Sequence, residues 1–265
     1  MKKTATVFLC AVACVCTGCI WFVGGQAGAY AWNIAVCILA PAAIITLLVQ
    51  VPVFMIALHK KKNVLWNIAF TVVLLLIALP ITVLIGVSPV TYPTHANPND
   101  AVAMTLPVED AVLFGGKGYK THAMWPSECY AYDILKNPYD IGSENLDDYG
   151  IFSCDIAAPI SGTVIGLENK EPDIIPNTDA FSSALGNYIF IEIDTTGTYL
   201  ILAHLQQDSI SVKIGDHVKQ GQVIGKVGNS GTTSEPHLHI QHQRDNPLET
   251  AFPICAEGLP ILFEK

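Results

Sequence analysis

Acidic residues are absent from the first 99 positions of this 265-residue chain. Charge of either sign is scarce there, which excludes a water-exposed globular surface for most of this third. Its basic side chains are only Lys2, Lys3, Lys60, Lys61 and Lys62. All 23 acidic residues lie from Asp100 onward, against 9 of the 14 basic residues, so this part has a net charge of −14. Because nucleic-acid binding depends on neutralising phosphates, we expect no nucleic-acid partner.

The uncharged third contains three long apolar runs, Thr4–Val23, Ala31–Leu58 and Val64–Val87. Each is long enough to cross a hydrocarbon core of about 30 Å, which requires about 20 apolar residues. Residues 1–87 are therefore expected to form a three-helix transmembrane region. Gln50 is the main polar residue of the second run, and we expect it to form an interhelical hydrogen bond.

Lysine and arginine are missing from Gly24–Tyr30 and from the segment just after Val87. The positive-inside rule then places the N-terminus and the lysine loop in the cytoplasm, with everything after about Ser88 outside. A cleaved signal peptide is the alternative for the first run, because Met1-Lys-Lys is a suitable charged start. That run, however, is long and lacks a small-x-small exit.

Outside the apolar runs, paired Cys-x-x-Cys spacing is lacking, which argues against a structural zinc site made of cysteines there. Outside the apolar runs only Cys129, Cys154 and Cys255 remain, so at most one disulfide can form. We expect these three to be packing residues with an optional bridge.

No useful helical period of apolar residues appears after residue 110. Residues 88–104 are rich in proline and asparagine and are typical of an extended extracytoplasmic linker. Short apolar runs bounded by glycine follow, such as Gly162–Gly166, Tyr188–Ile193 and Tyr199–His204. We therefore expect an all-β domain over 105–265, an antiparallel β-sandwich or barrel-sandwich. The polar stretches 135–149 and 168–184 are expected to be its long loops.

Two histidines lie two residues apart in the run Pro236-His-Leu-His-Ile240. If this run is a strand, His237 and His239 leave the same face, about 6.5 to 7 Å apart at their Cα atoms. Such a pair suits one metal ligand and one neighbour beside an open coordination position. By the same alternation His242 faces the opposite side from His239. The plainer interpretation is two surface histidines.

Three further side chains are candidates for the same chemistry. Asp133 follows Tyr130-Ala-Tyr, and alternation points it inward, where an unpaired carboxylate is costly and a metal is one possible partner. His122 precedes it, and His204 ends an apolar strand, where a hydrogen-bonded buried histidine is the alternative. Two histidines, one aspartate and a water make the ligand set of a catalytic zinc site. We expect His95, in the linker, to be inert and His217, in a turn, to be a solvated surface residue.

The motifs around these residues resemble the lysostaphin/LytM-type zinc endopeptidases, a family of cell-wall peptidoglycan hydrolases. The resemblance covers roughly Tyr119 to Gln241. It rests on Leu202-Ala-His-Leu205, on Val212-Lys-Ile-Gly-Asp-His-Val-Lys-Gln-Gly-Gln-Val-Ile-Gly-Lys-Val-Gly-Asn-Ser-Gly231 and on Glu235-Pro-His-Leu-His239.

The resemblance implies one zinc ion held by His122, Asp133 and His239, with His204 and His237 as the catalytic histidines. The family's usual early motif is His-x-x-x-Asp before an Ala-Pro strand, but Ile151 stands four residues before Asp155. A longer variant, in which His and a Tyr-Ala-x-Asp strand are further apart, fits His122 and Asp133. Asp155 is the second candidate ligand.

The implied function is hydrolysis of peptide bonds in the stem or cross-bridge of peptidoglycan by a multi-pass membrane protein. Two other classes remain open. Some members of this family lose metal ligands and bind wall or activate other hydrolases. The segment 212–225 also resembles lipoyl-type carrier hairpins, although no convincing modified lysine stands at its tip. The sequence also leaves open a membrane-protein partner for the three spans, of unknown identity.

Overall fold

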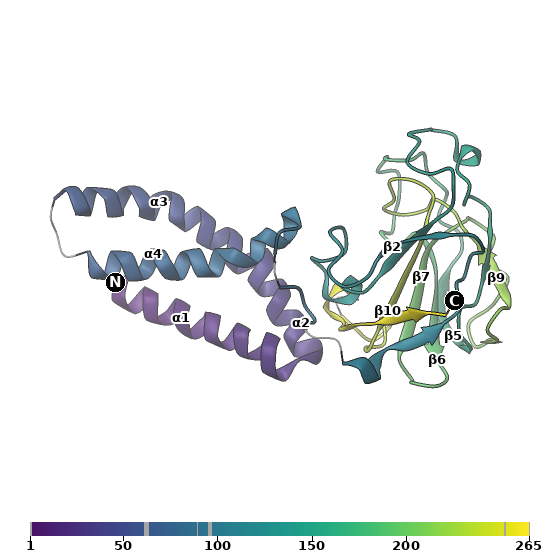
Figure 1. The fold of residues 1–265 in the computed structure, drawn as a ribbon, viewed down its shortest axis with the longest axis horizontal. Helices are drawn as coiled ribbons and strands as arrows, with labels where there is room; N and C mark the ends of the chain where they lie inside the picture. The colour runs from purple at the N-terminus through teal and green to yellow at the C-terminus, as the bar shows by residue number, and fades with distance from the viewer. Residues whose placement is uncertain (1, 61–63, 89, 95–96, 252, 265) are drawn as a thin grey trace.

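The computed structural model describes residues 2–60, 64–88, 90–94, 97–251 and 253–264. Lys61, Lys62 and His95, to which the sequence assigns roles, lie outside these residues. The described chain has two parts, an N-terminal group of helices and a C-terminal β domain (Figure 1).

Three helical runs are long and apolar enough to cross a membrane: Lys3–Val23, Gly25–His59 and Leu65–Ile85. They confirm the three predicted runs by length and composition, and the second begins six residues before the predicted Ala31. Their segments are α1 (Lys2–Gly18), η1 (Cys19–Val23), α2 (Gly25–Ile34), η2 (Ala35–Leu39), α3 (Ala40–His59), α4 (Leu65–Ala78) and η3 (Leu79–Ile85).

Gln50 is buried between α3 and α4, where its amide donates to the Oδ1 of Asn67 at 3.5 Å and to the Oγ1 of Thr71 at 3.4 Å. The interhelical hydrogen bond predicted for Gln50 is thus confirmed. The start of α1, which begins at Lys2, and the end of α3, which precedes Lys60, lie at the end of the bundle away from the β domain (Figure 1). The predicted orientation requires this arrangement, and the orientation itself stays a prediction.

The β domain is built on one eight-stranded sheet in the order β2-β3-β10-β7-β6-β5-β8, with β11 beside β10. All its pairs are antiparallel, as predicted. Two-stranded sheets β4–β9 and β1–β12 complete it, and only the β1–β12 pair is parallel among the described strands. The strands are β1 (Val102–Met104), β2 (Val112–Gly115), β3 (Tyr132–Leu135), β4 (Asp155–Ala157), β5 (Gly162–Glu168), β6 (Asn187–Ile193), β7 (Tyr199–Leu205), β8 (His217–Val218), β9 (Val223–Lys226), β10 (Leu238–Gln243), β11 (Gly258–Leu259) and β12 (Ile261–Phe263).

One face of the large sheet forms the core of the domain. Strand alternation puts Ile189 and Ile191 of β6, Leu202 of β7, and Leu238 and Ile240 of β10 into a single buried cluster. A smaller apolar cluster around Phe190, Ile201 and Ala203 covers part of the opposite face. Residues at odd positions of β10 therefore lie on that second face.

The described chain after residue 110 has no α-helix, in agreement with the sequence. Its helical turns are single and of the 3₁₀ type: η5 (Pro126–Glu128), η6 (Leu146–Asp148) and η7 (Pro253–Cys255). The stretches 135–149 and 168–184 run between strands as expected, with η6 inside the first. Cys129, Cys154 and Cys255 are free thiols.

The segment 88–104 does more than connect the two parts. Tyr92 is buried, and its hydroxyl donates to the carbonyl of Gly25 at 2.6 Å. The segment continues through η4 (Pro98–Asp100) into β1, where Val102 pairs with Ile261. Both ends of this predicted linker are therefore held against folded structure, because it carries buried apolar side chains as well as prolines.

Candidate metal centre

The candidate site lies on the second face of the large sheet, at the interior strand β10. His239 stands opposite Asp133 of β3 on one side and Ala203 of β7 on the other. Residues directly opposite in an antiparallel pair share a face, so this register brings the Asp133 carboxylate to the His239 imidazole.

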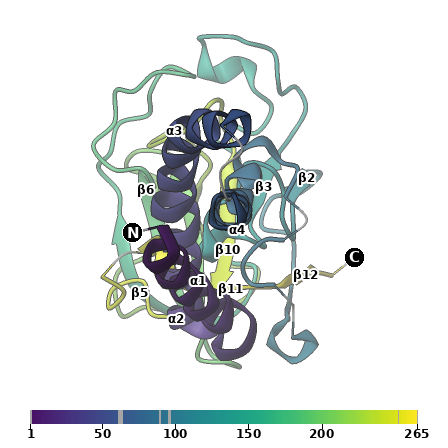
Figure 2. The same ribbon diagram turned by 90° about the vertical axis from the view of Figure 1, so that its left-hand side faces the viewer.

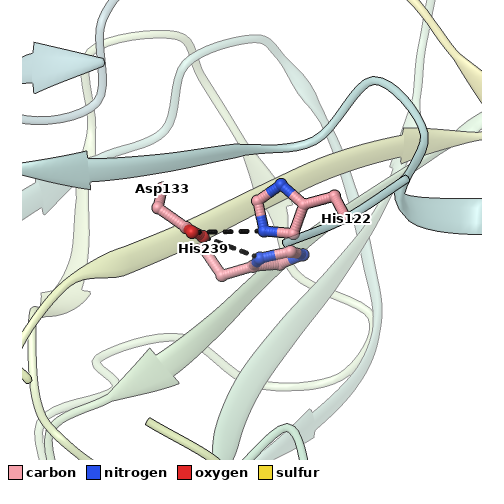
Figure 3. A group of neighbouring side chains, drawn as sticks. All are labelled: His122, Asp133 and His239. Atoms are coloured by element: carbon pink, nitrogen blue, oxygen red, sulfur yellow. Dashed lines mark hydrogen bonds and ion pairs between the residues drawn. The ribbon is translucent and has the colours of Figure 1, made fainter. Parts of the chain in front are cut away.

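Asp133 is the centre of the group. Its Oδ2 lies 3.2 Å from Nε2 of His122 and its Oδ1 lies 3.1 Å from Nδ1 of His239 (Figure 3). The ligand atoms of all three residues lie within 4.8 Å of one another. In a tetrahedral zinc site with bonds of 2.0 to 2.2 Å, neighbouring ligand atoms are about 3.3 Å apart. Two edges of the group match this spacing.

His122 reaches the site from a turn before β3. Its backbone N–H and that of Ala123 both donate to the carbonyl of Tyr119, at 2.9 and 2.8 Å, and the N–H of Trp125 donates to the His122 carbonyl. The ring is buried and meets the His239 ring edge-on, with centroids 5.1 Å apart. This turn directs Nε2 of His122 toward Asp133.

The outer nitrogen of His239 is held by Gln241. Nε2 of His239 lies 3.0 Å from Oε1 of Gln241, whose amide donates to Oε1 of Gln243 at 2.9 Å. Because an amide oxygen only accepts, Nε2 carries a proton, and Nδ1 is the atom left to share a proton with the carboxylate of Asp133 or to bind a cation beside it. A carboxylate facing a bare nitrogen needs a cation or a proton between them. The donor set therefore fits a metal ion, with Gln241 as its outer support.

Gln241 is a site residue that the sequence motifs did not single out. The signal that could have found it is the alternation that puts positions 239, 241 and 243 of one strand on one face.

His204 and His237 lie beside the group. The ring centroids of His204 and His237 are 4.7 Å apart, and those of His204 and His239 are 6.0 Å apart. Nδ1 of His204 contacts the carbonyl of Ser230 at 2.8 Å, and Nδ1 of His237 contacts the carbonyl of Glu235 at 2.8 Å. Carbonyl oxygens accept, so in both rings Nδ1 carries a proton and Nε2 is the nitrogen left to accept or release another.

The charges of the site reinforce one another. Burial disfavours the Asp133 anion, but the charge of His237 and the hydrogen bonds from His122 and His239 hold its pKa well below the ordinary value. Burial likewise opposes a charge on His239, yet the hydrogen bond and charge of Asp133 raise its pKa to about 9. Burial, together with His237 and His239, lowers the pKa of His204 well below its usual range, so His204 is neutral. A metal entering the site would displace a proton.

The remaining candidates lie elsewhere. Asp155 is exposed at the start of β4 and pairs with Lys226 at 2.7 Å. His217 is exposed and pairs with Asp194 at 2.8 Å. His242 is buried on the opposite side of β10 from His239, as alternation predicts, and its Nδ1 contacts the Pro260 carbonyl.

Two clefts meet at Ser234, next to His237. One, of about 340 Å³, contains Asp133 and His237 and extends to Tyr139 in the loop 135–149. The other, of about 290 Å³, extends to Phe181 in the loop 168–184. The two long loops thus line the approaches to the site. A larger cavity of about 480 Å³ lies among α1, η2 and α4, is lined by apolar side chains, and is remote from the histidines.

Comparison with known proteins identifies a family match. Residues 152–249 match the sequence model of peptidase family M23. The matched region contains His204, His237 and His239, whereas His122 and Asp133 precede it.

Three curated relatives illustrate the similarity. The peptidoglycan DD-endopeptidase ShyC of Vibrio cholerae is 34% identical over 87 residues, 33% of this chain and 18% of that protein. Lysostaphin of Staphylococcus simulans is 30% identical over 105 residues, 39% of this chain and 20% of that protein. Stage II sporulation protein Q of Bacillus subtilis is 30% identical over 159 residues, 56% of this chain and 49% of that protein. The chain thus spans less than half the length of each.

Two solved structures are also similar. The catalytic domain of lysostaphin from Staphylococcus simulans aligns with 56% of this chain and 86% of its own, at 20% identity and a TM-score of 0.34. The SpoIIQ–SpoIIIAH pore-forming complex aligns with 59% of this chain and 87% of the matched chain, at 18% identity and a TM-score of 0.36.

Proposed function

Because residues 152–249 match the sequence model of peptidase family M23, we propose that this protein is a membrane-anchored, zinc-dependent endopeptidase that hydrolyses peptide bonds of peptidoglycan. In this proposal residues 1–87 are the membrane region, 88–104 the connection and 105–265 the metallopeptidase domain. The observation that carries the proposal is the convergence of His122, Asp133 and His239 beside two further histidines.

We assign one zinc ion to Nε2 of His122, a carboxylate oxygen of Asp133 and Nδ1 of His239. When bound there, zinc supplies a Lewis acid that polarises a scissile carbonyl and lowers the pKa of a water toward about 7. Gln241 keeps the His239 ring in the tautomer whose Nδ1 can bind the ion.

His204 and His237 are the proposed proton-handling residues. Each has its Nδ1 proton committed to a backbone carbonyl, so Nε2 is the atom that accepts a proton from the attacking water. The resulting imidazolium holds the developing oxyanion and then returns the proton to the leaving amine. The low pKa of His204 keeps that ring neutral before the reaction.

The proposed substrate is a stem or cross-bridge peptide lying along the two clefts that meet at Ser234. Relatives named as a peptidoglycan DD-endopeptidase and a glycyl-glycine endopeptidase support this class of substrate. With the N-terminus in the cytoplasm, the site would face outward, where the wall lies. The wall is then within reach of a domain held close to the membrane.

The alternative is a non-catalytic protein of the same fold that binds wall or activates another hydrolase. The match to stage II sporulation protein Q, which spans 56% of this chain, supports this non-catalytic alternative. SpoIIQ has been solved in complex with SpoIIIAH, and this alternative likewise includes a partner protein. The complete set of two histidines and one aspartate with two neighbouring histidines favours catalysis.

The deciding experiment incubates the full-length protein in detergent with purified peptidoglycan, with and without a chelator, and identifies the new peptide termini. We expect cleavage that the chelator stops and that added zinc restores. His239→Ala should lose bound zinc and reduce cleavage by at least about a thousandfold, since it removes a ligand. His217→Ala, at an exposed ion pair away from the site, is the control and should cleave normally.

Each result is decisive. Undiminished cleavage by His239→Ala, or in excess chelator, would refute the zinc assignment. Stoichiometric zinc in the wild-type protein without any new termini would favour the non-catalytic alternative.

A further inference from the structure

The helix α2 packs directly against the segment that carries a proposed zinc ligand. Trp32 of α2 is buried, and its Nε1 donates to the carbonyl of Met124 at 2.9 Å. On the next residue, the Asn33 amide donates to the carbonyl of Ile254 at 3.4 Å and contacts Sγ of Cys255 at 3.3 Å. These contacts join residues 92 to 222 positions apart. They tie α2 to two separate turns of the β domain.

These polar contacts border one apolar cluster, which we call the docking cluster. It is formed by buried side chains from α2, η2, η3, the segment 88–104 and both turns, namely Ala29, Trp32, Val36, Val83, Tyr92, Ala123 and Cys255. Burial of the Trp32 ring in this cluster partly shields its hydrogen bond from water. The helices and the β domain therefore meet at a packed contact as well as through the chain connection (Figure 2 views the pair from the helical end).

The turn Tyr119–Trp125 contacts both this cluster and the metal group. On one side of the turn, Ala123 packs into the docking cluster and the Met124 carbonyl accepts a hydrogen bond from Trp32. His122, which directly precedes Ala123, faces Asp133. The turn is closed by its own backbone hydrogen bonds, so a displacement on the α2 side moves the His122 backbone as well.

The same helix continues into the longest candidate span. Gly25–His59 has 35 residues, a length of about 50 Å at 1.5 Å per residue, whereas a hydrocarbon core is about 30 Å thick. The 20 residues of α3 are enough to cross the hydrocarbon core, so α2 can lie outside the core. A tilt of the span is therefore carried by a continuous helix to the docking cluster.

We propose that α2 is a positioning element of the metal centre: through Trp32 it fixes the turn that carries His122, so the membrane helices set the affinity of the site for its metal. Trp32 is thus a positioning residue and touches neither the metal nor the substrate. The inference rests on the proposed zinc site. It also predicts that a membrane partner binding these helices would alter the site.

The first test compares the same substitution at two tryptophans in the full-length protein. Trp32→Phe keeps an aromatic ring but removes the Nε1 donor, whereas Trp66→Phe lies at the opposite end of the bundle, in the first turn of α4. Zinc affinity is measured by chelator competition, and the visible absorption of bound Co²⁺ reports the ligand geometry. We expect Trp32→Phe to weaken zinc binding about two- to tenfold and to shift the Co²⁺ bands, because one partly buried hydrogen bond is lost. Trp66→Phe should match the wild type.

A second matched pair guards against simple misfolding. A methyl group added at Gly28 would clash with the hydroxyl and ring of Tyr92, whereas one added at Gly18 meets nothing within 4 Å. Gly28→Ala should therefore loosen the docking cluster and weaken zinc binding, and Gly18→Ala should not. Zinc affinities of Trp32→Phe and Gly28→Ala both within twofold of the wild type would overturn the proposal.

A readout that needs no metal separates this inference from the proposed function. Amide hydrogen exchange over residues 119–125 of the zinc-free protein should be faster in Trp32→Phe and Gly28→Ala than in their controls, since the N–H groups of His122, Ala123 and Trp125 are hydrogen-bonded in the turn. Equal exchange in all four variants would refute the positioning role even if the enzyme is active. Faster exchange in a protein that cleaves nothing would leave the positioning role intact and refute the endopeptidase.

Discussion

Asp133 illustrates how much one residue depends on its neighbours. Its carboxylate lies on a sheet face with three imidazoles around it, the most distant being His237, whose Nε2 is 3.6 Å from Oδ1. A buried anion is tolerated there because each neighbour can supply a proton or share a cation. The same residue on an apolar face would have to be neutral. This balance, rather than the motif alone, makes the site suitable for a metal.

Gln241 offers a test of the outer support at the residue scale. Gln241→Leu keeps the size of the side chain but removes the acceptor for Nε2 of His239, so zinc affinity should fall about 10- to 100-fold. Gln241→Glu restores an acceptor and should recover most of the affinity. Chelator competition measures both. Equal affinities for Leu and Glu would show that this contact does not orient His239.

His242 gives a prediction on the other face of the same strand. Burial lowers its pKa to about 4, so the folded protein keeps it neutral. In the unfolded chain the pKa is about 6.5, so below this pH the unfolded state binds the extra proton. Its contribution to stability is complete above about pH 6.5 and is lost as the pH falls toward 4. By pH 5 the loss is about 2 kcal/mol.

The comparison with His242→Gln isolates this contribution from other titrating groups. The free energy of unfolding of the wild type should fall more steeply between pH 7 and pH 5 than that of His242→Gln. Denaturant unfolding of the full-length protein in detergent at both values measures this difference. Parallel slopes would contradict the assignment.

Among the elements, β7 and β10 place the reactive side chains by different means. β10 uses plain alternation, which separates His239 and Gln241 from the core residues Leu238 and Ile240. β7 instead contains a bulge opposite β6. Asn187 and Tyr188 are neighbours in β6, but they pair with Leu205 and Ala203 of β7, so His204 between them is an extra residue without a partner in the register. Its φ of +64° lies in the left-handed region. Bulges of this kind redirect a side chain next to a functional site.

The turn Tyr119–Trp125 also positions a side chain of the metal group. It supplies His122 to the metal group on one side and the Met124 carbonyl to Trp32 on the other. An isolated β domain lacking α2 would keep the strands but lose the partner of this carbonyl. Full-length protein is therefore the appropriate material for measurements of metal affinity.

For the whole molecule, the main prediction concerns orientation. A reporter fused after residue 265 and active only in the cytoplasm should stay silent, whereas one active only outside should respond, because three crossings start from a lysine-flanked N-terminus. A matched fusion after Lys60, following two crossings, should give the opposite pattern. Activity of the cytoplasmic reporter at the C-terminus would refute the proposed placement of the site.

The amino-acid sequence by itself determined the three apolar helices, the antiparallel β character of the rest, and the separation of His239 from His242. These follow from local properties, namely charge scarcity over a hundred residues and the two-residue period of a strand. Composition and period act on neighbouring residues, so no tertiary information was needed.

Only the tertiary structure decided which aspartate joins the histidines, which side chain supports His239, and what lies behind His122. Asp133 and Asp155 both follow plausible motifs, but the pairing of β3 with β10 brings Asp133 to His239, whereas β4 leaves Asp155 at the surface with Lys226. Trp32 and Met124 are 92 residues apart in the chain. Such contacts depend on strand register and on the packing of distant segments, and no short sequence pattern encodes them.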